Sequence, residues 1–204
     1  MTLGAISRLL VAVALTCAPL GAGGAQARTI ATPSARPALT IPLGRAILPD
    51  GRVDADEWRD ARAIDAAPDV RLYLKRDDQF LYVAVVRSAP AIFGVNLYLA
   101  ASDTARSLNL HASAKLGERQ GRAGAWPEWV WWNNAGWTAN VARGESFTER
   151  RFLPDTAKEF QIRLSRLPAR GFGLSLDLET AQGTTPLLTG APTREGLHWL
   201  ALQL

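Results

Sequence analysis

Strict alternation of apolar and polar residues is the feature that most limits what this chain can fold into. Six stretches of the sequence place apolar side chains at every second position, as a β-strand with one buried face does. These stretches are residues 70–75, 95–99, 108–115, 160–165, 172–179 and 198–204. Residues 80–86 (FLYVAVV) are instead apolar throughout, which indicates a central strand that is buried on both faces.

The spacing of these strands predicts the fold class. Turn-forming residues separate most of them, and no long helical pattern is present. We therefore expect an all-β fold, an antiparallel β-sandwich of two sheets with a jelly-roll or immunoglobulin-like arrangement. One short helix is expected near the N-terminus, over residues 54–61 (DADEWRDA), with Asp54 as its cap and Glu57 completing a capping box.

The first 27 residues have the layout of a secretory signal peptide. Arg8 precedes an apolar run at residues 9–15, which is too short to span a bilayer, and residues 25–27 (AQA) form a cleavage signal. Residues 28–38, rich in Pro, Ala, Ser and Thr, are expected to be a flexible linker, and residues 39–204 the folded domain. We expect a periplasmic or secreted protein. Lipidation at Cys17 is an alternative, although residues 14–16 (ALT) match a lipoprotein signal poorly.

Removal of this segment changes the chemistry that is available to the chain. The single Cys and the single Met both lie in it, so the mature chain has no disulfide, no thiolate zinc ligand and no thiol nucleophile. Loss of Arg8 takes the formal net charge from +4 to +3. No run of five like charges occurs, and this absence argues against a nucleic-acid partner.

Four sequence motifs resemble those of family 9 carbohydrate-binding modules and their DOMON-like relatives. They are residues 49–61 (PDGRVDADEWRDA), 70–85 (VRLYLKRDDQFLYVAV), 159–167 (EFQIRLSRL) and 171–177 (GFGLSLD). The resemblance implies a sugar-binding β-sandwich, often beside an enzyme, in which two aromatic rings hold the sugar. These motifs belong to the scaffold of the fold, so the resemblance does not assign a ligand-binding role to any residue of this sequence. Some relatives bind haem, commonly with a Met side chain as the iron ligand, and the mature chain contains no Met.

A cluster of tryptophans provides the candidate carbohydrate site. Five of the seven Trp residues fall between positions 126 and 137. An indole face stacks on the C–H groups of a pyranose ring, while a neighbouring carboxylate or amide bonds its hydroxyl groups. The candidate carbohydrate-binding residues are Trp126, Glu128, Trp129, Trp131, Asn133 and Trp137.

The same segment predicts a strand and a turn. Trp129 and Trp131 would share one face, Trp132 would lie on the other, and residues 133–136 would form the turn. Trp126 and Trp137, at the two ends, are expected to be the most exposed indoles. Two other interpretations stay open, namely core and hairpin packing, or contact with another protein of the cell envelope.

Three further residues carry expectations of their own. Trp58, within the short helix, is expected in the core. Trp199, on the last strand, faces either solvent or a groove. His111 alternates with apolar residues, so we expect it to be an ordinary surface side chain.

No catalytic motif is recognised in the sequence, and we expect a non-catalytic protein without a cofactor. Calcium is an alternative, with Asp50, Asp54, Asp77 or Asp78 as donors, although turn and capping roles explain these residues better. The leading hypothesis is binding of a mono- or oligosaccharide, as an accessory to a separate glycoside hydrolase. The alternative is a structural or protein-interaction module of the cell envelope.

Overall fold

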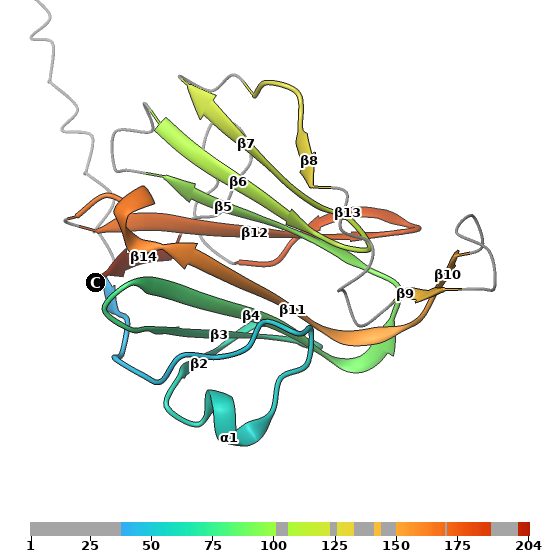
Figure 1. Cartoon of the computed structure of the whole chain (residues 1–204), viewed down its shortest axis with the longest axis horizontal. Helices are drawn as coiled ribbons and strands as arrows, with labels where there is room; N and C mark the ends of the chain where they lie inside the picture. Colours follow the sequence, from blue (N-terminus) through green and yellow to red (C-terminus); the bar gives the residue numbers. More distant parts are fainter. Residues whose placement is uncertain are drawn as a thin grey trace, which may run out of the picture. The chain divides into compact units, whose positions relative to one another are not determined.

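Two β-sheets packed face to face form the architecture, as the alternation predicts (Figure 1). The computed structural model describes residues 38–100, 106–122, 126–132, 141–143, 150–169, 171–188 and 200–204. All neighbouring strands pair antiparallel except the first and the last, which pair parallel, with Leu39 opposite Leu202. The prediction of an all-β sandwich is therefore confirmed.

The larger sheet has eight strands. In spatial order they are β1 (Leu39–Thr40), β14 (Leu200–Gln203), β12 (Phe172–Thr180), β5 (Gly94–Ala100), β6 (Arg106–Ala112), β7 (Leu116–Arg122) and β8 (Val130–Trp132), with β13 (Gly183–Pro186) also paired to β12. Among the described residues, no strand pairs with the outer edge of β8.

The smaller sheet has four strands in the order β11 (Asp155–Arg163), β4 (Phe80–Ala91), β3 (Val70–Arg76) and β2 (Arg62–Ala67). A separate pair consists of β9 (Val141–Arg143) and β10 (Arg150–Phe152). The helical elements are α1 (Ala55–Trp58) and the short 3-10 helix η1 (Leu164–Arg166).

The core lies between the two sheets and is built from the alternating apolar positions. Leu72 and Val83 of the smaller sheet meet Leu97 and Leu176 of the larger one within a single cluster. Burial of such side chains contributes about 1.5–3 kcal/mol each. Every second residue of the larger sheet must then point away from the core, which is where the candidate site lies.

Strand β4 is buried on both faces, as its continuous apolar sequence predicts. Its second face carries Tyr82 and Ala84, which pack with Ile47 and Trp58 in a separate small cluster. Trp58 is 3% exposed, so its expected core position is confirmed.

The helix is shorter than expected and is held differently. Asp54 occupies the cap position of α1, but its side chain makes no capping hydrogen bond, so the expected capping box is wrong. The Glu57 carboxylate instead accepts the Leu48 N–H at 3.5 Å. At the other end, the buried ammonium of Lys75 donates to the Glu57 carbonyl and to Asp60 Oδ1. A cation at a helix C-terminus offsets the missing cap.

A carboxylate of β11 ties the N-terminal loop to the sandwich. Glu159 accepts the Trp58 Nε1–H at 3.0 Å and the Gly51 N–H at 2.8 Å. Gly51 has a φ of 83°, a conformation that favours glycine. Burial raises the pKa of Glu159 to about 7, reinforced by the charges of Asp50 and Glu57 and opposed by the two hydrogen bonds.

The raised pKa of Glu159 predicts a pH-dependent stability. Between the unfolded pKa of 4.5 and the folded pKa of about 7, Glu159 is protonated in the folded state but ionised in the unfolded state. Its contribution to the free energy of unfolding is therefore fully present below pH 4.5 and is lost as the pH rises to about 7. The free energy of unfolding of the wild type should fall by on the order of 1 kcal/mol between pH 5 and 7.5, after allowance for partial solvent screening. Glu159→Gln should remove this fall. Urea unfolding at both pH values measures it.

Asp56→Asn controls for the loss of one negative charge near the same helix. Equal pH slopes for the wild type and Glu159→Gln would contradict the assignment of this slope to Glu159.

Candidate functional site

Polar residues form ordered rows across the outer face of the larger sheet, which we define as the face directed away from the core. Strand register places these side chains next to one another. One row runs Asp177, Asn96, His111, Gly117 and Trp131; the next runs Ser175, Tyr98, Asn109 and Arg119. Residues far apart in sequence thus meet on one surface.

Three indoles fold back over these rows, and two glycines make room for them. A Cβ at Gly117 would stand 2.7 Å from Cε3 of Trp131, and a Cβ at Gly121 would stand 2.9 Å from Cε3 of Trp126. The rings of Trp129 and Trp131 stack on each other, with centroids 5.1 Å apart and planes 26° apart. We call Trp126, Trp129 and Trp131 the indole shelf.

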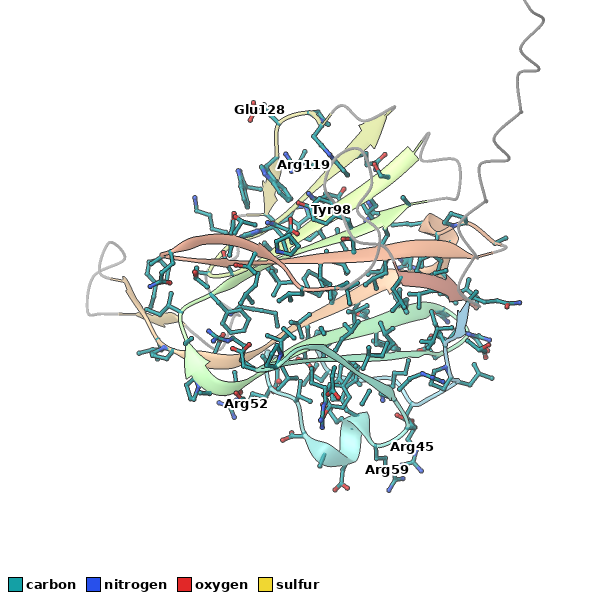
Figure 2. All side chains as sticks on the ribbon, turned by 180° about the vertical axis from the view of Figure 1, so that it is seen from behind. Arg45, Arg52, Arg59, Tyr98, Arg119 and Glu128 are labelled. Atoms are coloured by element: carbon teal, nitrogen blue, oxygen red, sulfur yellow. The ribbon has the colours of Figure 1, made fainter. Side chains whose placement is uncertain are left out.

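Arg119 lies against the indole shelf. Its guanidinium carbon is 5.0 Å from the centroid of Trp126 and 4.4 Å from that of Trp129, within cation–π range. Its Nε is buried without a hydrogen bond, and no described carboxylate forms an ion pair with it. Figure 2 shows Arg119 and Tyr98 near each other on this side of the sheet.

Beneath the indole shelf the polar side chains are dehydrated. The Tyr98 hydroxyl donates to Asp177 Oδ2 at 2.9 Å, and burial, then the Asp177 charge, raises the pKa of Tyr98 to about 12. Asn109 is 0% exposed. Its amide lies close enough to the Tyr98 hydroxyl to lower that pKa, yet neither Nδ2 nor Oδ1 has hydrogen-bond geometry with any partner. An unmatched buried amide costs about 1–3 kcal/mol.

The expected surface position of His111 is wrong, since this side chain is only 7% exposed. The segment that carries the indole shelf folds over β6 and β7, and the edges of Trp129 and Trp131 meet the imidazole. Burial lowers the pKa of His111, against the opposing charge of Glu179. The neutral ring is then assigned the tautomer that donates from Nδ1 to Asn96 Oδ1 and accepts from Ser113 at Nε2, both at 2.8 Å.

Of the six predicted site residues, the fold brings three together. Trp126, Trp129 and Trp131 form the indole shelf, but Trp126 is half-buried, so its expected exposure is wrong. Glu128 is exposed and projects away from Tyr98 and Arg119 (Figure 2). Asn133 and Trp137, with the uncertain Trp199, lie outside the described residues.

Of the tryptophans that the structure describes, Trp131 and Trp132 are the exposed ones, at 45% and 39%, and they face opposite sides of β8. Trp132 lines a cleft of about 260 Å³ with Leu116, Phe160 and Arg166, and His111 and Gly117 also contribute to its lining. The Arg166 guanidinium there is paired to Glu118 at 2.8 Å. The two faces of β8 therefore offer chemically different surroundings.

The spacing of the stacked pair decides how this surface can hold a ring. A sugar held between two indoles needs ring planes roughly 7–8 Å apart, because each stacking contact takes about 3.5–4 Å. Trp129 and Trp131 at 5.1 Å leave no such gap. Among the described residues, the indole shelf is thus a platform that offers exposed ring surface, and the pair does not form a slot.

Sequence reasoning missed Tyr98, Asn109, Arg119 and Asp177. Tyr98, Asn109 and Asp177 occupy the polar positions of alternating strands, which are ordinarily solvated, and Arg119 lies in β7, whose sequence does not alternate. One signal was present, because residues 117–121 (GERQG) place a glycine on each side of Arg119 with the period of a strand, shortly before the tryptophans. Small residues on the face of a strand mark a close approach by another group.

Two of the four aspartates considered for calcium, Asp50 and Asp77, serve in turns. Asp77 accepts the N–H groups of Gln79 and Phe80, both at 2.7 Å, and the Tyr82 hydroxyl. Asp50 accepts the N–H of Arg52 at 2.9 Å. Within the described ranges, no group of three or more His, Cys, Asp or Glu side chains is arranged to hold a metal ion. No helix found there is long and apolar enough to cross a membrane.

Comparison with known proteins returns no match to a family model, to a curated protein or to a solved structure. The resemblance to family 9 carbohydrate-binding modules therefore stays a prediction, and the function has to be argued from the geometry of the site.

The fit of Trp131 over Gly117 predicts a specific coupling. Gly117→Ala should displace the indole and lower the free energy of unfolding by about 1 kcal/mol, because the exposed ring can move aside at modest cost. The same change in a Trp131→Ala background should be nearly neutral. A double-mutant cycle from denaturant unfolding measures the difference. Equal effects in both backgrounds would show that the ring does not lie there.

Proposed function

We propose that the protein binds a saccharide on the indole shelf. The observation that carries this proposal is the exposed indole of Trp131 beside a row of polar side chains on the outer face of the larger sheet. A ring stacked on such a surface buries its C–H groups, while its hydroxyl groups remain within reach of polar atoms. Specificity then comes from the few polar groups beside the ring.

The surroundings of the indole shelf supply several such groups. Arg119 offers N–H donors, and Lys115 lies 5.5 Å from the Trp131 ring centroid. Both side chains retain some exposure. The floor beneath is fixed by the Tyr98–Asp177 hydrogen bond and by the contacts of His111. A rigid floor lowers the entropy cost of binding.

The geometry favours a platform site over an enclosed one. A ligand that stacks on one face of an indole keeps much of its own hydration, so we expect dissociation constants in the micromolar to millimolar range. Such weak binding suits a module that holds a polymer by several sugar units at once.

Adjacent tryptophans on opposite faces of β8 provide a matched test. Trp131→Ala should weaken binding of a responding oligosaccharide about tenfold, because aromatic stacking contributes about 1–3 kcal/mol per ring. Trp132→Ala, which removes an indole of similar exposure from the other face, should leave the affinity unchanged. Calorimetry against a panel of neutral and acidic oligosaccharides gives the constants.

Two outcomes would count against the proposal. One is the absence of measurable heat from every sugar at millimolar concentration. The other is an equal loss of affinity in both variants, which would place the ligand elsewhere or indicate a general loss of fold.

A second candidate function is a protein-interaction module of the cell envelope. The observation that favours it is β8, whose outer edge pairs with no described strand and whose side chains Val130, Trp131 and Trp132 are all exposed. Such an edge can accept a strand from a partner. Val130→Lys should then abolish capture of that partner from an envelope extract, whereas saccharide binding on the indole shelf would survive this change.

The expected signal peptide at residues 1–27 indicates where in the cell this function would be carried out. We propose that the protein acts in the periplasm or outside the cell, as a non-catalytic accessory to a separate glycoside hydrolase. Detection of the processed chain by mass spectrometry, beginning at Arg28, would test the export step.

A further inference from the structure

We infer that the ligand of the indole shelf is an acidic saccharide, whose uronate carboxylate is received by Arg119. This inference rests on the proposed saccharide binding and narrows its ligand class. It follows from the charges around the shelf, from the geometry of the Arg119 side chain and from an unmatched amide beneath it.

Arg119 carries a charge that the described part of the protein does not neutralise. Some buried and half-buried cations elsewhere have carboxylate partners: Lys75 pairs with Asp60 at 2.8 Å, and Arg87 with Asp69 at 2.7 Å. Half-buried Arg76, like Arg119, has no ion pair with a described carboxylate, but it does not lie against the indole shelf. Arg119 has ring faces but no such partner among the described residues. Glu118, its neighbour in sequence, points to the opposite face and is occupied by Arg166.

A second cation stands at the other end of the indole shelf. Lys115 lies beside the Trp131 ring, is exposed, and has no ion pair with any described carboxylate. Glu128, which lies between Trp126 and Trp129 in the sequence, projects away from Tyr98 and Arg119 (Figure 2). Of the nearby acids below, Asp177 accepts from Tyr98, and Glu179 lies 3.6 Å from His111. Two cations therefore lie against the indole shelf, Arg119 partly exposed and Lys115 exposed.

The shape of the guanidinium favours a carboxylate. Contact with two indole faces restricts the planar fork of Arg119, which leaves its N–H edge as the route for hydrogen bonding. A carboxylate matches that fork with two parallel hydrogen bonds, while a hydroxyl group can accept only one of them. A uronic acid combines this carboxylate with a C–H face that stacks on indole.

The amide of Asn109 adds unused polar capacity directly below. It lies opposite Arg119 in the strand register and is fully buried. Neither Nδ2 nor Oδ1 has hydrogen-bond geometry with a partner, although the amide lies close enough to the Tyr98 hydroxyl to lower the pKa of that group. A small shift of Arg119 on ligand binding would let a water reach this amide and recover part of the cost of its burial.

The experiment compares ligands that differ in charge alone. Oligomers of glucuronate and galacturonate are titrated as free acids, as methyl esters, and as the corresponding neutral hexose oligomers, at low and at physiological salt. We expect at least one free acid to bind about tenfold or more tightly than its ester, with a preference that weakens as salt is added. Sulfated oligosaccharides form a separate arm.

Variants assign the preference to a residue. Arg119→Gln should abolish the preference for the free acid, and Arg119→Lys should reduce it, because it keeps the charge but loses the fork. Arg163→Gln is the matched control, since Arg163 also lies over an aromatic ring, that of Phe80 in the smaller sheet, at 5.3 Å. Circular dichroism checks that each variant is folded.

The outcomes distinguish the proposal of saccharide binding from the proposal of an acidic ligand. Binding of esters or neutral sugars as tight as that of the acids would overturn the acidic class and leave saccharide binding intact. Failure of all saccharides to bind would overturn both. Stronger binding of sulfated sugars, or an acid preference that survives Arg119→Gln, would overturn the assignment of a carboxylate to Arg119.

Discussion

The dehydration of polar side chains on the outer face of the larger sheet is the constraint on which the candidate site depends. A sheet that packs one face on a core ordinarily leaves its other face in water. Here Tyr98, Asn109 and Asp177 are almost fully buried on that second face. Buried polar groups are costly unless they are matched. The register matches Tyr98 with Asp177 through a hydrogen bond, while the Asn109 amide next to it has no partner in hydrogen-bond geometry.

Two glycines make this arrangement sterically feasible. Without a Cβ at positions 117 and 121, strand β7 presents flat backbone to the rings of Trp131 and Trp126. Arg119, between the glycines, then meets the indole faces and does not extend freely into water. One strand thereby sets the height of the aromatic surface and the position of its nearest positive charge.

The sequence was sufficient to predict the layers of the fold but not the environment of each face. Alternation identified six of the strands and the sandwich, and continuous apolar residues identified β4 as buried on both sides. Strands such as β2 and β7, whose sequences do not alternate, were not found. The common face of Trp129 and Trp131 also followed from period two. Alternation cannot tell whether a polar face is solvated or covered, so His111 was wrongly placed at the surface, and Arg119 and Asn109 were missed. These positions depend on cross-strand neighbours, which a linear pattern does not contain. The expected capping box of α1 is also absent. The contacts that Lys75 makes at the other end of this helix could not be predicted from the local pattern, because Lys75 comes from a strand that follows the helix in the sequence.

The parallel pairing of β1 with β14 has a consequence for how the protein folds. Leu39 lies opposite Leu202, so the edge of the larger sheet joins the start of the folded region to its end. Loop closure over such a separation is entropically unfavourable until most other contacts exist. During synthesis the smaller sheet cannot be completed before β11 emerges, and the larger sheet must wait longer, for β14. The larger sheet therefore closes late in folding, and until β14 joins it, β12 lacks one of its neighbours and β1 lacks its only described partner.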